Sequence, residues 1–94
     1  MLFEVGQTVI TRGLHNTIEN NEQAQKEVSK IFNRYINGDW GNLDDYDKKL
    51  NDNAVKYNND RILGKYHINS INRDIYIITE FDRSYTTFLF CNEY

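Results

Sequence analysis

The sequence predicts an α+β fold in a single small domain, and three observations lead to this prediction. A β-branched segment opens the chain, two segments with the helical period follow, and after Asp60 the period changes to the alternation of strands. We expect a short N-terminal strand, two or three helices, and then a three-stranded antiparallel meander with the helices packed on one face. A length of 94 residues fits one domain, spanning residues 1–94, and is too short for two.

The first strand is expected within GQTVITRG, where β-branched residues lie between Gly6 and Gly13. A short helix is then predicted from Leu14 to about Glu19, because Leu14 and Ile18 stand one helical turn apart and can be buried together.

The second helix has the clearest pattern in the chain. Asn20 is expected to cap its start, with Gln23 as the reciprocal partner, and Gly38 to follow its end. One apolar stripe at helical spacing predicts its buried face: Ala24, Val28, Ile31, Phe32, Tyr35 and Ile36.

The segment GDWGNLDDYD is expected to lead into a third helix, with Asp44 as the N-cap. Asp45 and Asp47 then lie in the first turn, where the helix dipole favours acidic residues. It is expected to end near YNND, since Asn readily adopts the left-handed conformation. Its apolar stripe is interpreted as a buried face: Leu43, Tyr46, Leu50, Ala54 and Tyr57.

Three strands are expected in RILGKYHIN, RDIYIITEF and YTTFLF, joined by the short turns NSIN and FDRS. The first strand of the chain is expected to join this sheet. The final strand, TTFLF, is interpreted as an exposed edge able to pair with a second copy, so both a monomer and a homodimer stay open.

Composition bears on several functions. A net charge of −3 argues against a general nucleic-acid binder, which needs clustered Lys and Arg. No apolar stretch is long enough to span a membrane, and MLFEVGQTVI lacks the features of a signal peptide. The single Cys91 cannot form an internal disulfide, which favours a cytoplasmic protein. No cofactor is predicted.

TEFDRSYTT carries the densest set of polar side chains. As structure, Asp82 is a favoured first residue of a turn, and Glu80 can pair across strands with Arg83 or a neighbour. In the functional interpretation, a polar cluster forms from Glu80, Asp82, Arg83 and Ser84. The Arg83 guanidinium can then bind a carboxylate or phosphate through two parallel hydrogen bonds, or the two acids can act as a general acid–base pair. Thr residues in this segment suit strand positions: Thr79, Thr86 and Thr87.

GDWGNLDD invites a metal-binding interpretation, because four carboxylates lie close together in sequence: Asp39, Asp44, Asp45 and Asp47. The calcium-loop pattern is absent, however, so no metal ligand is predicted. In the structural interpretation Gly38 and Gly41 permit a sharp turn and Trp40 fills the edge of the core; if Trp40 is exposed instead, it becomes an anchor for a partner.

No spacing announces a catalytic centre. His67 with Cys91 or Ser84 can only be brought together by the fold, and no nucleophile elbow, phosphate loop, CxxC or HExxH is present, so no catalytic residue is predicted. A local basic patch requires convergence of four arginines: Arg12, Arg61, Arg73 and Arg83.

The stretches GQTVITRG, GDWGNLDDYDKKLND, RILGKY and IYIITEFDRSYTTFLFCNEY together resemble a family of small bacterial proteins of about 90 residues that are labelled uncharacterised, plasmid-related or restriction-endonuclease subunit. The chain departs from the family pattern at Phe90–Cys91, where Leu–Pro is more frequent, which puts in doubt any role tied to that strand end. The resemblance implies a mobile genetic element and brings no reaction. It rests on Gly6, Gln7, Thr11, Gly13, Gly38, Asp39, Trp40, Gly41, Asp47, Asn51, Asp52, Thr79, Glu80, Asp82, Arg83, Ser84, Thr86, Thr87, Glu93 and Tyr94.

These observations favour a non-enzymatic protein-interaction module of a mobile element, acting against a host defence such as CRISPR or restriction by occupying a protein surface. The predicted contact residues are Trp40, Glu80, Asp82, Arg83 and Tyr85. Two alternatives stay open: a ligand-binding domain or enzyme that holds phosphate or a metal at Glu80, Asp82, Arg83 and Thr86, and nucleic-acid binding through the arginines.

Overall fold

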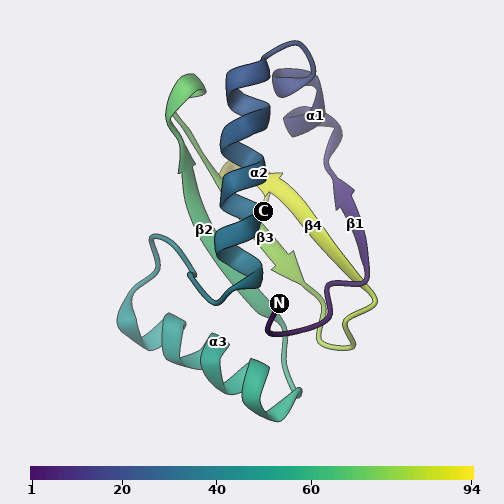
Figure 1. The fold of residues 1–94 in the computed structure, drawn as a ribbon, viewed down its shortest axis with the longest axis vertical. Coiled ribbons are helices and arrows are strands. Elements are labelled where there is room, and N and C mark those ends of the chain that lie inside the picture. Colours follow the sequence, from purple (N-terminus) through teal and green to yellow (C-terminus); the bar gives the residue numbers. More distant parts are fainter.

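The computed structural model describes residues 1–94 and has the predicted α+β class (Figure 1). None of its helices has both the length and the apolar character needed to cross a bilayer. In chain order the elements are β1 (Gln7–Ile10), α1 (Arg12–Ile18), α2 (Glu22–Ile36), α3 (Asp45–Tyr57), β2 (Ile62–Ile68), the 3₁₀ turn η1 (Asn69–Ile71), β3 (Arg73–Thr79), β4 (Tyr85–Phe90) and the 3₁₀ turn η2 (Cys91–Glu93).

The strands form one four-stranded sheet in the order β1-β4-β3-β2. The antiparallel meander of β2, β3 and β4 is confirmed, and β1 joins it as predicted, running parallel to β4. The interpretation of TTFLF as a sheet edge is wrong, because β1 pairs with β4 and makes it an interior strand.

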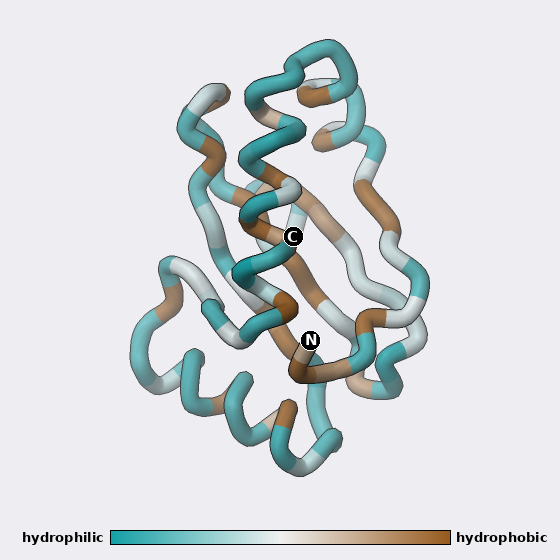
Figure 2. Tube along the Cα trace, viewed as in Figure 1, coloured by the Kyte–Doolittle hydropathy of each residue, from teal (hydrophilic) through white to brown (hydrophobic).

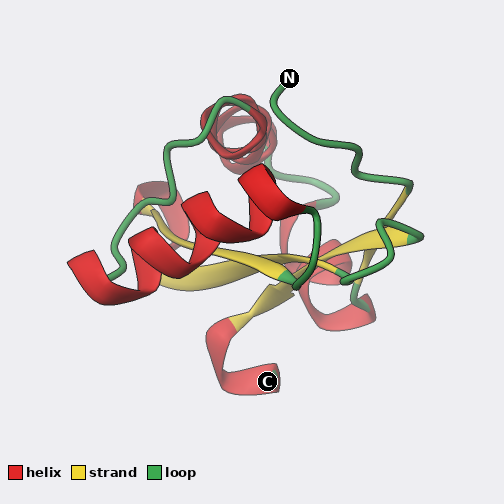
Figure 3. Ribbon diagram, turned by 90° about the horizontal axis from the view of Figure 1, so that it is seen from below, coloured by secondary structure: helices red, strands yellow, loops and turns green.

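Helix α2 lies across one face of the sheet, and η2 lies on the other (Figure 3). Residues in β2 alternate between buried and half-buried, so Ile62, Tyr66 and Ile68 point into the core beneath α2. Hydrophobic residues concentrate along the central strands (Figure 2). The stripe predicted for α2 is confirmed: every member is in the core or packed against it.

Helix starts differ slightly from the prediction. The N-cap of α2 is Asn21 rather than Asn20, and its side chain accepts a hydrogen bond of 3.0 Å from the Ala24 N–H. Helix α1 begins at Arg12, two residues earlier than expected, because the Thr11 hydroxyl caps it by accepting from Leu14 N–H. The predicted burial of Leu14 and Ile18 in α1 is confirmed. Gly38 follows α2 with a φ of 88°, a left-handed conformation suited to glycine.

Helix α3 has the predicted ends but not the predicted orientation. Asp44 caps it, accepting a 2.8 Å hydrogen bond from the Asp47 N–H, and Asn58 ends it in the left-handed conformation. Only Ala54 of the predicted stripe is buried and Leu43 half-buried. The correction has a physical cause: α3 lies at the β2 edge rather than over a sheet face. The buried Asn51 there donates to the Leu63 carbonyl at 2.7 Å and accepts from its N–H at 3.1 Å.

Candidate functional site

The turn TEFDRSYTT is built around a buried arginine. Arg83 is only 9 % exposed, and its guanidinium donates to the carbonyls of Asp60 at 2.6 Å, Ala54 at 3.0 Å, and Glu80 and Phe81 at 3.1 Å each. Ala54 lies in the last turn of α3, where carbonyls lack partners within the helix and the dipole attracts cations. Arg83 therefore joins the turn to the end of α3, and little of its side chain is accessible for the partner contact that the sequence predicts.

The remaining polar groups of the turn also have local roles. Asp82 accepts a 3.0 Å hydrogen bond from the Ser84 N–H, and hydrogen bonds from the Ser84 side chain and N–H lower the pKa of the Asp82 carboxyl. Glu80 forms no ion pair with Arg83, which uses the Glu80 carbonyl oxygen instead. The geometry therefore supports the structural interpretation of this segment as a turn. The backbone turn starts at Glu80, whose carbonyl accepts from the Arg83 N–H at 2.9 Å, and Asp82 starts the side-chain turn to Ser84.

Behind the turn, three buried hydroxyl groups form a chain. The hydroxyl oxygens are 2.7 Å apart in the pair Tyr35–Thr79 and in the pair Thr79–Thr86. The Thr86 hydroxyl is also 2.7 Å from the Val5 carbonyl oxygen. A carbonyl can only accept, so Thr86 donates to Val5 and Thr79 donates to Thr86. The Tyr35 hydroxyl then donates towards Thr79, and the Ile62 carbonyl at 3.2 Å is a second acceptor for it. Burial raises the pKa of Tyr35, which keeps its hydroxyl protonated as a donor. Thr86 is thereby committed to holding the N-terminal segment against β4.

These commitments leave few free polar groups for the predicted ligand site. A phosphate or metal at this end of the sheet would need free polar groups on Arg83 and Thr86. The Thr86 hydroxyl and both terminal nitrogens of Arg83 are hydrogen-bonded to the chain itself, and only the Arg83 Nε, which is buried, has no partner. No three side chains of the His, Cys, Asp and Glu type form a group able to hold a metal ion.

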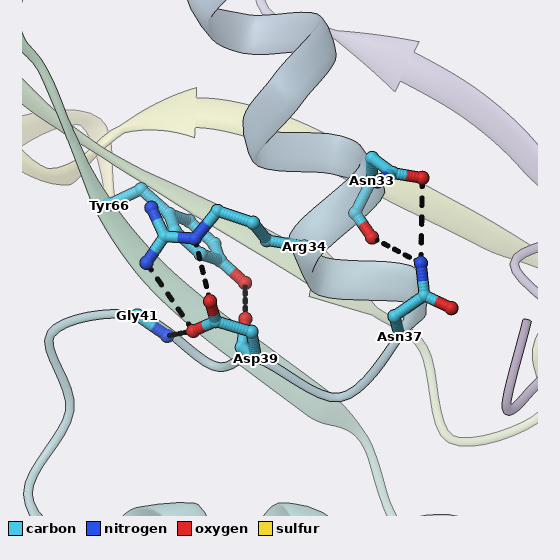
Figure 4. A network of polar contacts seen from close by, with 6 residues as sticks. All are labelled: Asn33, Arg34, Asn37, Asp39, Gly41 and Tyr66. Carbon is cyan, nitrogen blue, oxygen red and sulfur yellow. Dashed lines mark hydrogen bonds and ion pairs between the residues drawn. The ribbon is translucent and has the colours of Figure 1, made fainter.

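The GDWG segment is held by a second polar network (Figure 4). Arg34 donates to Asp39 through Nε at 2.8 Å and Nη2 at 3.3 Å, and these hydrogen bonds hold the pKa of Asp39 below its usual range. The Gly41 N–H donates to the same carboxylate and the Tyr66 hydroxyl to the Asp39 carbonyl. A Cβ at Gly41 would stand 2.0 Å from the Lys65 carbonyl oxygen, so this close approach to β2 requires glycine.

Trp40 belongs to the core. It is 3 % exposed, its ring lies 5.7 Å from that of Tyr35 and 5.9 Å from that of Phe3, and its Nε1 donates to Asp52 at 2.9 Å. The prediction that Trp40 fills the edge of the core is confirmed, and its burial leaves little of the side chain accessible to the predicted partner.

The four arginines do not converge. Strand register places Arg61 and Arg83 at one end of the sheet and Arg12 and Arg73 at the other. These four residues therefore do not form the basic patch on which the nucleic-acid alternative depends.

Residues suited to nucleophilic catalysis are also separated or occupied. The His67 Nδ1 pairs with Asp74 Oδ1 at 2.7 Å, while Ser84 lies at the opposite end of the sheet. Burial raises the pKa of Cys91, which is the reverse of what a reactive thiolate needs.

The outward face of α3 carries large apolar side chains that nothing in the chain covers. Tyr46 is 73 % exposed, Leu50 48 % and Tyr57 61 %. Their spacing puts all three on one side of the helix. We call them the α3 stripe. The helical spacing predicts that these three residues share one side of α3, but the prediction that this side is buried is wrong.

A groove adjoins the α3 stripe. Its volume is about 400 Å³, and Leu50 forms part of its wall. The Tyr94 ring packs edge-on against Tyr76 at 5.5 Å between centroids, and Arg61 lies over Tyr94 at 5.8 Å. The other apolar residues that line the groove are Leu43 and Leu63, and its charged ones are Asp47, Asp60 and Arg61.

Exposed side chains also remain at the turn. Among the predicted contact residues, Asp82 and Tyr85 are exposed and Glu80 is half-buried. Phe81, which is not among the predicted contact residues, is also exposed. An apolar residue within a polar turn is the sequence feature that indicates this exposure.

Comparisons of the chain with models of protein families, with curated proteins and with solved structures gave no match.

Proposed function

We propose that this protein is a non-enzymatic interaction module that binds a partner protein through the α3 stripe and the adjoining groove. The observation that carries the proposal is the outward position of Tyr46, Leu50 and Tyr57. An amphipathic helix normally buries its apolar side, and large apolar groups left together on a surface mark interaction sites.

The chemistry of the α3 stripe suits a protein contact. Tyrosine presents a large, rigid ring with a polar tip and is enriched among residues that dominate binding energy. The groove next to Leu50 has room for an apolar side chain of the partner. Lys56 lies over the Tyr57 ring at 5.2 Å, so a cation borders the apolar surface and favours an acidic group on the partner.

The turn extends this surface towards one end of the molecule. Arg83 binds the carbonyls of Ala54 in α3 and of Phe81 in the turn, so the two segments are held together. Exposed Phe81, Asp82 and Tyr85 are then the accessible part of TEFDRSYTT, with half-buried Glu80 beside them. In this proposal Arg83 positions the contact surface without forming part of it.

The class of partner rests on the resemblance of the sequence motifs to proteins of mobile elements. Such an element benefits from blocking a host defence, so we expect a defence nuclease complex, of CRISPR or restriction type, as the partner. The expected cytoplasmic location suits a partner of this kind. A surface that occludes another protein needs no catalytic group, which agrees with the structural roles found for Arg83 and Thr86.

The test is capture of partners from host lysate by the intact protein and by a variant with Tyr46→Ala, Leu50→Ala and Tyr57→Ala. Alanine favours helix, so α3 should persist, and circular dichroism checks this. Loss of hot-spot side chains costs about 2 kcal/mol or more each, so binding should fall by at least about 100-fold.

A second variant, Phe81→Ala with Tyr85→Ala, removes comparable apolar groups from the turn and shows whether the turn contributes. Retention of a defence nuclease by the intact protein, and not by the α3 variant, is the expected result. Equal recovery with both proteins, or no partner for a correctly folded intact chain, would contradict the proposal.

A further inference from the structure

One edge of the sheet is open. In β1, the N–H of Gln7 donates to the Ser84 carbonyl at 3.1 Å, and just beyond the strand the N–H of Thr11 donates to the Phe88 carbonyl at 3.0 Å. Because backbone groups alternate along a strand, those of Thr8 and Ile10 face away from β4. Figure 1 shows β1 at the margin of the molecule with no element beyond it.

The opposite edge is covered as far as Lys65. In β2, the outward groups of Leu63 bind the Asn51 side chain, and Lys65 exchanges hydrogen bonds with the Trp40 carbonyl and the Asn42 N–H. Proteins commonly protect an exposed edge with lysine, proline or a bulge. Strand β1 reads Gln-Thr-Val-Ile and has no charge and no proline. Its open backbone is therefore suited to receiving another strand.

We infer that β1 pairs with β1 of a second copy, antiparallel and across a two-fold axis at Val9. Only this register places Thr8 of each chain opposite Ile10 of the other, so that each pair exchanges both of its outward hydrogen bonds. Val9 then stands opposite Val9, at the closer spacing of a pair without hydrogen bonds. The two sheets become one continuous sheet.

The side chains support a second copy as the occupant. Val9 is 37 % and Ile10 39 % exposed, and neighbouring residues of a strand point to opposite faces, so β1 presents an apolar group on each face of the sheet. On the helical face, Ile10 of the second copy meets Thr8 at a groove of about 210 Å³ bordered by Val28 and Phe88. Because the axis relates identical uncharged strands, no like charges oppose each other within the pairing.

The size of the contact sets its strength. Strands of four residues bury less than the roughly 1,200–2,000 Å² of a standard stable interface. The dimer is therefore in equilibrium with the monomer and forms as the concentration rises. The edge is separate from the α3 stripe, so dimerisation does not depend on the proposed partner.

Sedimentation equilibrium over a concentration series up to about 1 mM tests this inference. The average mass of the native chain should rise from 11.2 kDa towards twice that value. Amide hydrogen exchange, followed by NMR, should slow at Thr8 and Ile10 as the concentration rises and stay constant at the exposed α2 residue Lys30. This second measurement needs no variant.

Two variants and a matched control complete the test. Val9→Lys places like charges at the axis, and Thr8→Pro removes a donor that faces outward without loss of a bond to β4; both should remain at monomer mass. Val9→Thr keeps the branched shape and should dimerise within threefold of native. A constant monomer mass for the native chain, or a dimer that survives both substitutions, would overturn the inference. So would exchange protection at Thr8 and Ile10 that appears only with another protein.

Discussion

Replacing Arg83 with alanine should destabilise the fold by about 3 kcal/mol. Each hydrogen bond from a charged donor contributes about 1.5–3 kcal/mol. The full value applies to the buried Ala54 carbonyl, whereas the three acceptors of partly buried bonds regain water when the guanidinium is lost. Removal of the desolvated cation offsets part of the loss, which leaves a total near 3 kcal/mol.

This loss is large for a protein of 94 residues, whose unfolding free energy should be about 5–14 kcal/mol. At about 4–8 °C per kcal/mol, the melting temperature should fall by roughly 12–24 °C. Urea unfolding followed by circular dichroism and by fluorescence of the single Trp40 measures the free energy directly.

Backbone conformation supplies an internal control. Arg83 has a φ of 61°, which costs a residue with a Cβ about 1 kcal/mol relative to glycine. Arg83→Gly should therefore be more stable than Arg83→Ala by about that amount, although both lack the guanidinium. A loss below about 1 kcal/mol for Arg83→Ala, or a glycine variant no more stable than the alanine variant, would refute the bracing role of Arg83.

Three further predictions follow from the polar networks. Thr86→Val should cost about 1–3 kcal/mol in urea unfolding, because the Val5 carbonyl loses its donor and the Thr79 hydroxyl, which keeps Tyr35 as a donor, loses its acceptor. Thr87→Val on the other face should change stability by less than about 0.5 kcal/mol. Equal effects of the two substitutions would argue against the hydroxyl chain. Asn51→Asp removes the donor to the Leu63 carbonyl and should lower the free energy of unfolding more at pH 7 than at pH 3, because a carboxylate there repels the carbonyl oxygen. A loss of unfolding free energy that does not depend on pH would contradict this. Asp39 has a lowered pKa through Arg34, so its contribution is complete above the unfolded pKa of about 3.9 and disappears as the pH falls through the folded value. Asp39→Asn should accordingly cost up to about 1 kcal/mol at pH 7, because the pair is half exposed, with the difference from native narrowing below pH 4 in acid titrations of stability.

Local patterns were enough to predict most of the fold. The alternation in β2 and the apolar stripe of α2 follow directly from burial on one face, and the Asp44 cap follows from local hydrogen bonding. The parallel pairing of β1 with β4 depends on residues about 80 positions apart, and no local pattern encodes it. That single pairing is why TTFLF is interior instead of exposed.

The candidate site was harder to predict, because sequence shows which residues are apolar or polar but not what they meet. The period of α3 is correct, yet a buried polar residue, Asn51, sets which side faces β2 and turns the α3 stripe outward. The sequence predicts Arg83 as an exposed side chain that binds an anion. It does not show that four backbone carbonyls from three segments converge on the guanidinium. The motif residues Asp39, Trp40, Arg83 and Thr86 all support the fold, and the exposed apolar groups of α3 are not among the residues on which the resemblance rests.

The unequal edges of the sheet also limit how far assembly can proceed. A chain with two open edges can add copies on both sides and grow into a filament. Here Asn51 and the Gly41 segment occupy the β2 side, so only β1 can nucleate addition. Once two β1 strands have met, both outer borders of the joined sheet are β2 strands, whose backbone is already occupied at Leu63 and Lys65. Association through this edge therefore terminates at two chains, and the protein can tolerate an uncharged edge strand without a route to polymerisation.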